Sequence, residues 1–162
     1  MKKPDGLKRV LLAAVPGLAA DPTRLSIFVD KGKIGARGTR SLSFEYSYTL
    51  NVVLQDYAGD VDALMVPVLA WIAEVQPELF DKDPREPFSF EVELLDGDAV
   101  DVSIDLDLTE LVRVVPKPGG GYFVTHLDEP RAIDTFDDVA GINLRHLLLS
   151  DDVASTAIDL SE

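Results

Sequence analysis

Residues 41–76 read SLSFEYSYTLNVVLQDYAGDVDALMVPVLAWIAEVQ, and this stretch decides the fold. In its first half, apolar residues occupy every second position from Phe44 to Leu54, and mostly polar residues fill the positions between them. A period of two is typical of a β-strand with one buried and one solvated face. After the break at residues 57–60, apolar side chains recur at spacings of three and four. This second half predicts an amphipathic helix capped by Asp60.

Two aromatic side chains of this strand and helix are expected to meet in the core. Tyr46 lies on the apolar face of the strand, and Trp71 lies on the apolar face of the helix. We therefore expect them to be buried together. Pro67 falls inside the helical pattern and removes one backbone hydrogen bond, so the helix either kinks there or begins near Ala63.

The residues before this stretch contain two weaker patterns. Apolar spacing over residues 7–18 predicts a short helix that starts near Pro4 and ends or bends at Pro16-Gly17. In the next segment, RLSIFVDKGKIGARG (residues 24–38), apolar residues occupy alternate positions on both sides of Lys31-Gly32. It predicts a hairpin whose turn lies at these two residues. Its glycines lack the spacing of a phosphate-binding loop.

The residues after it predict a second hairpin. Phe88, Phe90, Val92 and Leu94 alternate and are expected to point inward, and Asp96-Gly97 supplies a strong turn signal. The returning strand then alternates to about residue 115, and residues 122–126 can add a short strand.

The predicted fold class is therefore α+β. We expect a mostly antiparallel sheet, built from two hairpin units and a long central strand, packed against two helices. Residues 1–128 are predicted to form a single domain, and residues 129–162 an acidic, partly ordered C-terminal extension.

Charge is distributed unevenly along the chain. The net charge is −14, from 15 basic and 29 acidic residues, which argues against a general polyanion-binding protein. Residues 1–40 nevertheless carry nine Lys and Arg against three Asp, whereas no Lys or Arg occurs between Glu86 and Glu110. The sequence thus presents a basic surface and an acidic surface. The basic candidates are Lys31, Lys33, Arg37 and Arg40, and the acidic candidates on one face of the second hairpin are Glu91, Glu93, Asp101, Asp105 and Asp107.

The acidic face has two explanations at this stage. Like charges facing one another across strands cost roughly 0.2–1 kcal/mol per pair, so the arrangement does not serve monomer stability. A solvated face that keeps sheet edges from aggregating is one explanation. The other is a face that meets a basic partner or repels DNA.

Reactive groups for an enzyme are scarce. The chain has no cysteine, and His126 and His146 are far apart and belong to no metal-ligand motif. The aspartates of the second hairpin have no calcium-loop spacing, and no nucleophile motif is present. We expect no enzyme activity and no cofactor. The longest uncharged apolar run, residues 63–73, is too short to span a bilayer, so no membrane partner is expected.

Three function classes follow from the residues alone. They are a structural assembly protein that docks onto copies of itself, an acidic adaptor or DNA-mimic protein that binds a basic protein, and a weak metal-assisted hydrolase. A ring-shaped particle, a one-to-one complex with a DNA-binding protein and divalent-dependent turnover would distinguish them.

Three segments also resemble one known family. SFEYSY (residues 43–48), VPVLAWI (66–72) and VDVSIDLDLTE (100–110) resemble the tail completion protein R family of Peduovirus-type contractile-tailed phages, prophages and tail-like particles. The resemblance covers roughly residues 4–128. The matching positions are mostly core positions, so they support the fold more firmly than any interface.

The resemblance implies a structural virion protein. It would act late in tail assembly, as a ring of six at the head-proximal end of the tail, and prepare the tail for head joining. The implied partners are further copies of the chain, tail tube and/or sheath proteins and head–tail connector proteins, with DNA passing without specific binding. The implied location is the virion tail, and the host cytoplasm during assembly.

Overall fold

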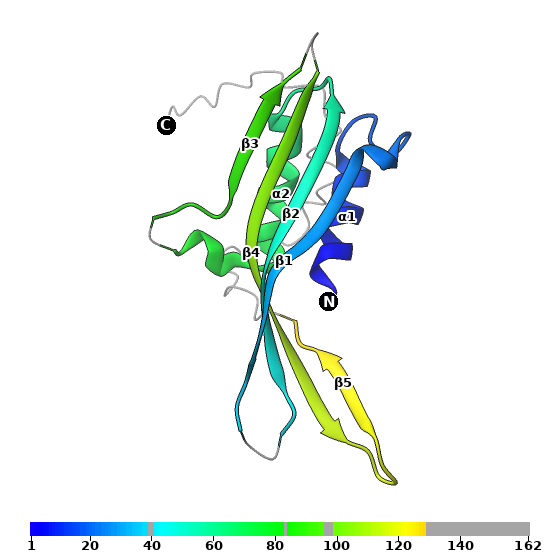
Figure 1. The fold of residues 1–162 in the computed structure, drawn as a ribbon, viewed down its shortest axis with the longest axis vertical. Helices are drawn as coiled ribbons and strands as arrows, with labels where there is room; N and C mark the ends of the chain where they lie inside the picture. Colours follow the sequence, from blue (N-terminus) through cyan, green and yellow to red (C-terminus); the bar gives the residue numbers. More distant parts are fainter. Residues whose placement is uncertain (39–40, 83, 96–98, 129–162) are drawn as a thin grey trace, which may run out of the picture. The chain divides into compact units, whose positions relative to one another are not determined.

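One antiparallel sheet organises the structure (Figure 1). The computed structural model describes residues 1–38, 41–82, 84–95 and 99–128, which belong to one unit spanning Met1–Ala132. Its elements are helix α1 (Lys3–Ala14), the short helix η1 (Pro22–Arg24), strands β1 (Leu25–Ala36) and β2 (Phe44–Tyr57), helix α2 (Asp62–Val75), the short helix η2 (Pro77–Phe80), and strands β3 (Ser89–Leu94), β4 (Val100–Pro116) and β5 (Tyr122–His126). The predicted C-terminal extension, residues 129–162, lies outside the described residues.

The two longest strands, β2 and β4, form the centre of the sheet. The strand order is β1-β2-β4-β3, and β5 pairs with the far end of β4. β2 and β4 pair from Phe44↔Val112 to Leu54↔Val102, so their apolar positions face the same side. The α+β prediction is confirmed, and β2 is the predicted central strand.

Both helices cover one face of the sheet and leave the other uncovered, as Figure 1 shows with the helices behind the strands. The core consists of the apolar sides of β2 and β4 and of the two helices; its largest fully buried apolar members are Leu7, Leu11, Leu50, Leu54, Leu64, Ile72, Leu79, Ile104, Leu106 and Leu108. Trp71 is 4% exposed in this core. The prediction that Asp60 caps α2 is wrong, because the N-cap residue is Val61, which has no side-chain cap. The Asp60 side chain instead accepts a hydrogen bond from the Asp62 amide at 2.9 Å, just before the helix, and α2 continues through Pro67.

The first predicted hairpin is wrong. Residues 25–36 form the single strand β1, which pairs with β2 along its whole length. The irregularity at Lys31-Gly32 is a register shift between Asp30 and Lys33, and Lys31 adopts a positive φ of 50°. A bulge and a turn both interrupt the alternation of side chains, so the pattern alone did not distinguish them. The connection to β2 follows residue 36.

Two burial predictions also need correction. Phe90, Val92 and Leu94 lie on the helix side of the sheet, but they are 55%, 37% and 81% exposed because β3 is an edge strand that the helices do not reach. Tyr46 packs against the core but is only partly buried, unlike Trp71, and its ring lies next to those of Phe44 and His126. The tyrosines that are buried are Tyr48 and Tyr57, at 3% and 5% exposure.

The sheet extends beyond the helices. The ends of β1 and β2 that meet at residues 36–44, and the hairpin formed by the end of β4 with β5, project past the N-terminal end of α1 as two arms (Figure 1). We call the second one, residues 111–127, the β4–β5 arm. It forms the predicted short strand over residues 122–126.

Candidate interaction surfaces

The acidic face is formed as predicted, on the side of the sheet without helices. The pairs Ser89↔Asp105, Glu91↔Ser103 and Glu93↔Asp101 place the carboxylates of β3 and β4 on the same face, with Glu93 directly opposite Asp101. β2 supplies hydrogen bonds to this row, because Thr49 Oγ1 donates to Asp107 at 2.7 Å and Asn51 Nδ2 donates to Asp105 at 2.6 Å. All five predicted acidic residues therefore lie on one face.

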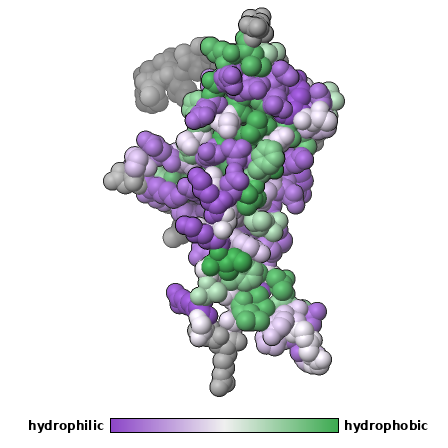
Figure 2. All heavy atoms as spheres, in the orientation of Figure 1, coloured by the Kyte–Doolittle hydropathy of each residue, from purple (hydrophilic) through white to green (hydrophobic). Residues whose placement is uncertain are grey.

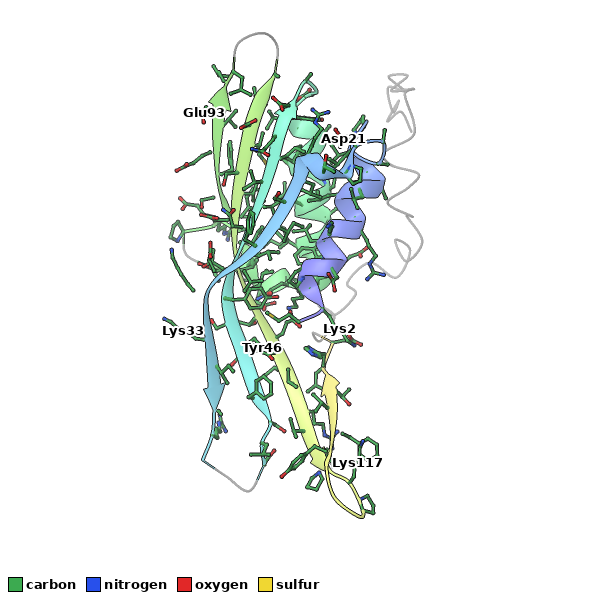
Figure 3. The ribbon with its side chains drawn as sticks, turned by 45° about the vertical axis from the view of Figure 1, so that its right-hand side comes forward. Lys2, Asp21, Lys33, Tyr46, Glu93 and Lys117 are labelled. Carbon is green, nitrogen blue, oxygen red and sulfur yellow. The ribbon has the colours of Figure 1, made fainter. Side chains whose placement is uncertain are left out.

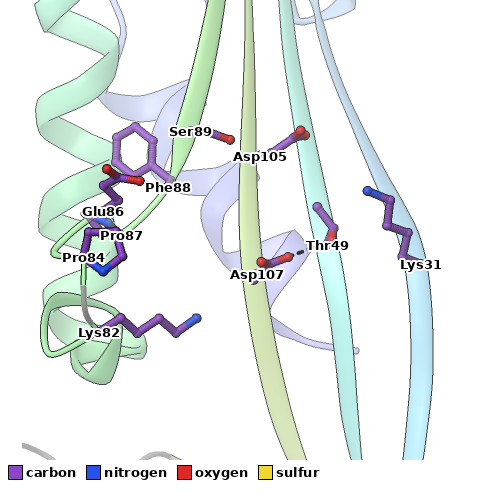
Figure 4. A pocket seen from close by; sticks show the side chains of 10 residues that line it. All are labelled: Lys31, Thr49, Lys82, Pro84, Glu86, Pro87, Phe88, Ser89, Asp105 and Asp107. Carbon is purple, nitrogen blue, oxygen red and sulfur yellow. Dashed lines mark hydrogen bonds between the residues drawn. The ribbon is translucent and has the colours of Figure 1, made fainter.

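A shallow hollow lies on this face (Figure 4). It has a volume of about 400 Å³, and Asp105 and Asp107 form its floor. Lys31 of β1 and Lys82, in the connection before β3, lie at its two sides. The acidic row is thus bordered by basic side chains of the same chain, which reduces its local charge.

The basic surface is only partly formed as predicted. Lys31 and Lys33 lie on strand β1 rather than in a loop, Arg37 follows directly after the strand, and Arg40 lies outside the described residues. Figure 3 shows Lys33 on β1 and Glu93 on β3, at opposite edges of the sheet. Lys33 and the β3 glutamates are therefore separated by the width of the sheet, whereas Lys31 borders the hollow that contains Asp105 and Asp107.

Exposed apolar residues gather on the arms. Figure 2 shows hydrophilic side chains over the middle of the helix-free face and hydrophobic ones over the β4–β5 arm. The exposed apolar residues of this arm are Leu111, Val115, Tyr122, Phe123, Val124 and Leu127. Lys117 lies 4.7 Å from the centre of the Phe123 ring. Concentrated apolar exposure of this kind marks surfaces that contact other molecules.

A buried carboxylate joins the helical body to the arm. Glu110 is 3% exposed and lies where β4 leaves the body. Its oxygens accept hydrogen bonds from the Lys2 amide at 2.9 Å, from the Lys3 amide at 3.3 Å and from the Tyr48 hydroxyl. His126 Nδ1 of β5 lies 2.9 Å from the same carboxylate. Glu110 thus connects the start of α1, strand β2 and strand β5.

The neighbours of Glu110 extend this network. Lys3 Nζ donates to Gln76 Oε1 at 2.9 Å, and Gln76 in turn contacts the Thr109 amide and hydroxyl. Among the described residues, no buried side-chain nitrogen or oxygen lacks a hydrogen-bond partner. The junction is a fully satisfied polar network, which rigidifies the structure around it.

The environment of Glu110 keeps it ionised. Burial by itself would raise the pKa of Glu110, but the hydrogen bonds from Tyr48 and from the Lys2 and Lys3 amides outweigh it, and the pKa is lowered. The two amides also belong to the N-terminal end of α1, where a negative charge is favourable. Burial and the neighbouring carboxylate raise the pKa of Tyr48, which therefore remains a donor.

The sequence analysis did not identify Glu110 as special. The signal was present, because Glu110 occupies an inward position in the alternation of Val102, Ile104, Leu106 and Leu108, where a carboxylate is costly without partners. Its partners come from residues more than 60 positions away, except for His126. They could not be located without the fold.

His126 belongs to this junction, and its replacement by glutamine tests how much the junction depends on it. His126→Gln is expected to leave assembly intact and to reduce the free energy of unfolding by about 1 kcal/mol or less, because one hydrogen bond is altered and an amide can still donate. Urea unfolding and native mass spectrometry measure the two effects. His126→Ala is the matched variant without a donor. A variant that folds normally but no longer assembles would contradict the prediction. The corresponding prediction for His146 lies outside the described residues.

The described residues contain neither a metal-binding cluster nor a membrane-spanning helix. Among residues 1–38, 41–82, 84–95 and 99–128 there is no cluster of three His, Cys, Asp or Glu side chains suited to a metal ion. Within the same ranges, no helix is long and apolar enough to cross a membrane. The notable features are the acidic face, the basic edge, the apolar arm and the Glu110 junction.

Comparison with known proteins identifies the family. The family model described as P2 phage tail completion protein R (GpR) matches residues 1–130. The chain is 43% identical over 132 residues to the "Tail completion protein R" of Escherichia phage P2, a match that covers 80% of this chain and 84% of that protein. No solved structure matches the chain. The matched region contains every described element, from α1 to the β4–β5 arm. The chain therefore belongs to the P2 tail completion protein R family of structural, non-enzymatic phage tail proteins.

Proposed function

We propose that this protein completes the phage tail as a ring of six copies at the head-proximal end, and prepares the tail for joining to the head. The observation that carries the proposal is the placement of a basic edge and an acidic edge on opposite sides of one sheet. A ring requires a heterologous interface, in which one surface of each subunit meets a different surface of the next. Two separated surfaces of opposite charge meet this requirement.

The charged residues have two possible places in such a ring. In the first, Lys31, Lys33 and Arg37, with Arg40 from outside the described residues, dock against the acidic residues of the neighbouring copy; these are Glu91, Glu93, Asp101, Asp105 and Asp107. In the second, the acidic face lines the channel through which DNA passes. Negative charge would then keep DNA from binding specifically.

The fold supports assigning some acidic residues to the subunit contact and others to the channel. Asp105 and Asp107 lie within the sheet on β4 and border the hollow, whereas Glu91 and Glu93 lie on the edge strand. Because the helices cover the other face, a ring built from these sheets with its helices outward has Asp105 and Asp107 toward the channel. The edge glutamates are then the ones available to a neighbour.

The ring also needs partners along the tail axis. We infer that these are tail tube and/or sheath proteins on one side and head–tail connector proteins on the other. The exposed apolar residues of the β4–β5 arm suit such a contact, since Tyr122, Phe123 and Val124 are each more than half exposed. Assembly would occur in the host cytoplasm and end in the virion tail.

Salt and charge reversal test the ring. If charges hold it together, raising ionic strength dissociates it, because exposed charges are screened beyond a Debye length of about 8 Å at physiological salt. We expect Glu91→Lys with Glu93→Lys to reduce the hexamer fraction in native mass spectrometry at least about tenfold, as repulsion at a heterologous contact costs several kcal/mol. Adding Lys31→Glu and Lys33→Glu should partly restore it.

Two variants complete the design. Asp105→Lys with Asp107→Lys should leave the ring intact and impair only DNA passage or head joining. Glu74→Lys, on the exposed side of α2, is the control for an unrelated charge change. A protein that stays monomeric at every concentration and salt would contradict the proposed ring.

A further inference from the structure

We propose that neighbouring copies join by antiparallel pairing of the exposed edge of β1, residues 28–36, with the edge of β3 in the next copy. The sheet of one subunit would then continue into the sheet of the next. This inference rests on the proposed ring and specifies the contact that joins neighbouring subunits. The molecule that pairs with each strand edge is a second copy of this chain, held by backbone hydrogen bonds as well as by side-chain contacts.

Each of the two strands has one edge that no other described strand pairs with. β1 pairs only with β2, and β3 pairs only with β4, among the strands of the described residues. Every residue of β1 from Phe28 onward is exposed, and so is every residue of β3. An exposed strand edge presents unpaired N–H and C=O groups and is a template for another strand.

The two edges complement each other on both faces of the sheet. On the helix side, β1 has Val29 and Ile34, which are 38% and 65% exposed, and β3 has three exposed apolar residues, Phe90, Val92 and Leu94. On the helix-free side, β1 has Lys33 opposite Ser47, Lys31 beside the acidic hollow and one carboxylate, Asp30 opposite Thr49. On the same side, β3 has Glu91 and Glu93. Pairing that keeps the faces aligned therefore joins apolar to apolar side chains on one face and, on the other, sets two lysines and one aspartate of β1 against two glutamates of β3, a net attraction.

Strand direction also favours a cyclic arrangement. β1 and β4 both run antiparallel to β2, and β3 runs antiparallel to β4, so β1 and β3 run in opposite directions. When copies stand side by side in the same orientation, β3 of one meets β1 of the next as an antiparallel pair. A symmetric dimer through β3 alone would instead place glutamates against glutamates, and one through β1 would place lysines against lysines.

The charges require a stagger between copies. Glu91 is level with Ser103 of β4, whereas Lys33 is level with Ser47 and hence with Thr109, six residues further along β4. Six residues correspond to about 20 Å, and four strands are about 19 Å wide. The stagger therefore implies strands tilted by about 45° to the ring axis, at the upper end of the typical range for closed barrels. The even number of residues preserves which face each side chain occupies.

Site-directed cross-linking tests the contact directly. The chain contains no cysteine, so every introduced thiol is the only one in its chain. Protein with Lys33→Cys is mixed with protein with Glu91→Cys and treated with a short bis-maleimide, which tolerates a register error of two residues. We expect the mixed dimer to exceed either homodimer at least about tenfold, because the contact is heterologous. Glu74→Cys on α2 replaces Glu91→Cys in the control and should give no specific product.

Hydrogen exchange of the unmodified protein provides a second measurement. In the ring, the amides of residues 28–36 and 89–94 whose N–H groups point outward should exchange at least about tenfold more slowly than in the monomer, since they gain backbone hydrogen bonds. Other amides of these strands already pair with β2 and β4 and serve as internal references.

The outcomes separate this inference from the proposed function. A ring in which the two cysteines do not cross-link and the edge amides are unprotected would overturn strand pairing while leaving the ring in place. Homodimer products alone would show a symmetric contact and overturn it as well. A chain that is monomeric under all conditions would overturn both.

Discussion

Glu110→Ala should reduce the free energy of unfolding by roughly 3–5 kcal/mol, the range for breaking a buried polar network. The carboxylate accepts from the Tyr48 hydroxyl and from the Lys2 and Lys3 amides, and it contacts His126. The substitution leaves these donors at a buried site without their acceptor. Urea unfolding followed by circular dichroism measures the loss.

Two further variants make the Glu110 result specific. Glu110→Gln keeps one acceptor oxygen and is expected to lose less than the alanine variant. Glu93→Ala removes an exposed carboxylate from β3 and should change the free energy of unfolding by no more than about 0.5 kcal/mol. Equal stability of Glu110→Ala and Glu93→Ala would show that the junction contributes nothing.

The lowered pKa of Glu110 gives the same variant a pH signature. A carboxyl group with a lowered pKa in the folded state stabilises the protein fully above its unfolded pKa, and the contribution is lost as the pH falls through the folded value. Glu110→Gln removes a group that titrates in this range. Its stability should therefore fall less steeply than that of the parent protein below about pH 4.5, the ordinary carboxyl pKa.

Trp71→Ala is the second substitution with a large expected effect, a loss of about 3–5 kcal/mol. Trp71 is 4% exposed in the core between the helices and the sheet, and a β-carbon added at Gly6 of α1 would lie 3.5 Å from its ring nitrogen. Removing the indole therefore opens a cavity where α1 and α2 meet. Thermal and urea unfolding measure the loss.

Leu69→Ala is the matched control on the same helix. Leu69 is 36% exposed, so its truncation should cost clearly less, about 1 kcal/mol or below. A Trp71→Ala variant with the melting temperature of the parent protein would contradict the burial of Trp71 between α1 and α2.

The central part of the fold could be predicted because its local patterns agree with its tertiary environment. β2 alternates from Phe44 to Leu54 and has one face in the core, and α2 follows with helical spacing and buries Leu64, Val68 and Ile72. The acidic face followed from the same alternation in β3 and β4. Strand periodicity determines the face of a side chain, so these residues were placed correctly.

Other features depend on which strand lies beside which, and this is not encoded locally. Lys31-Gly32 resembles a turn in sequence, but the long pairing of β1 with β2 makes it a bulge. Phe90, Val92 and Leu94 alternate like core residues, yet their exposure follows from the edge position of β3. The position of Arg37 relative to the acidic face likewise depends on the strand order.

The position of Glu110 has a consequence for the order in which the chain folds during synthesis. Helix α1 leaves the ribosome before the other elements of this unit, but its leading amides pair with a carboxylate 107 and 108 residues later. Its main helical neighbour, α2, is itself completed only at residue 75. Helix α1 is therefore anchored only after β4 has emerged, so the completed unit forms late and through long-range contacts, which slows folding.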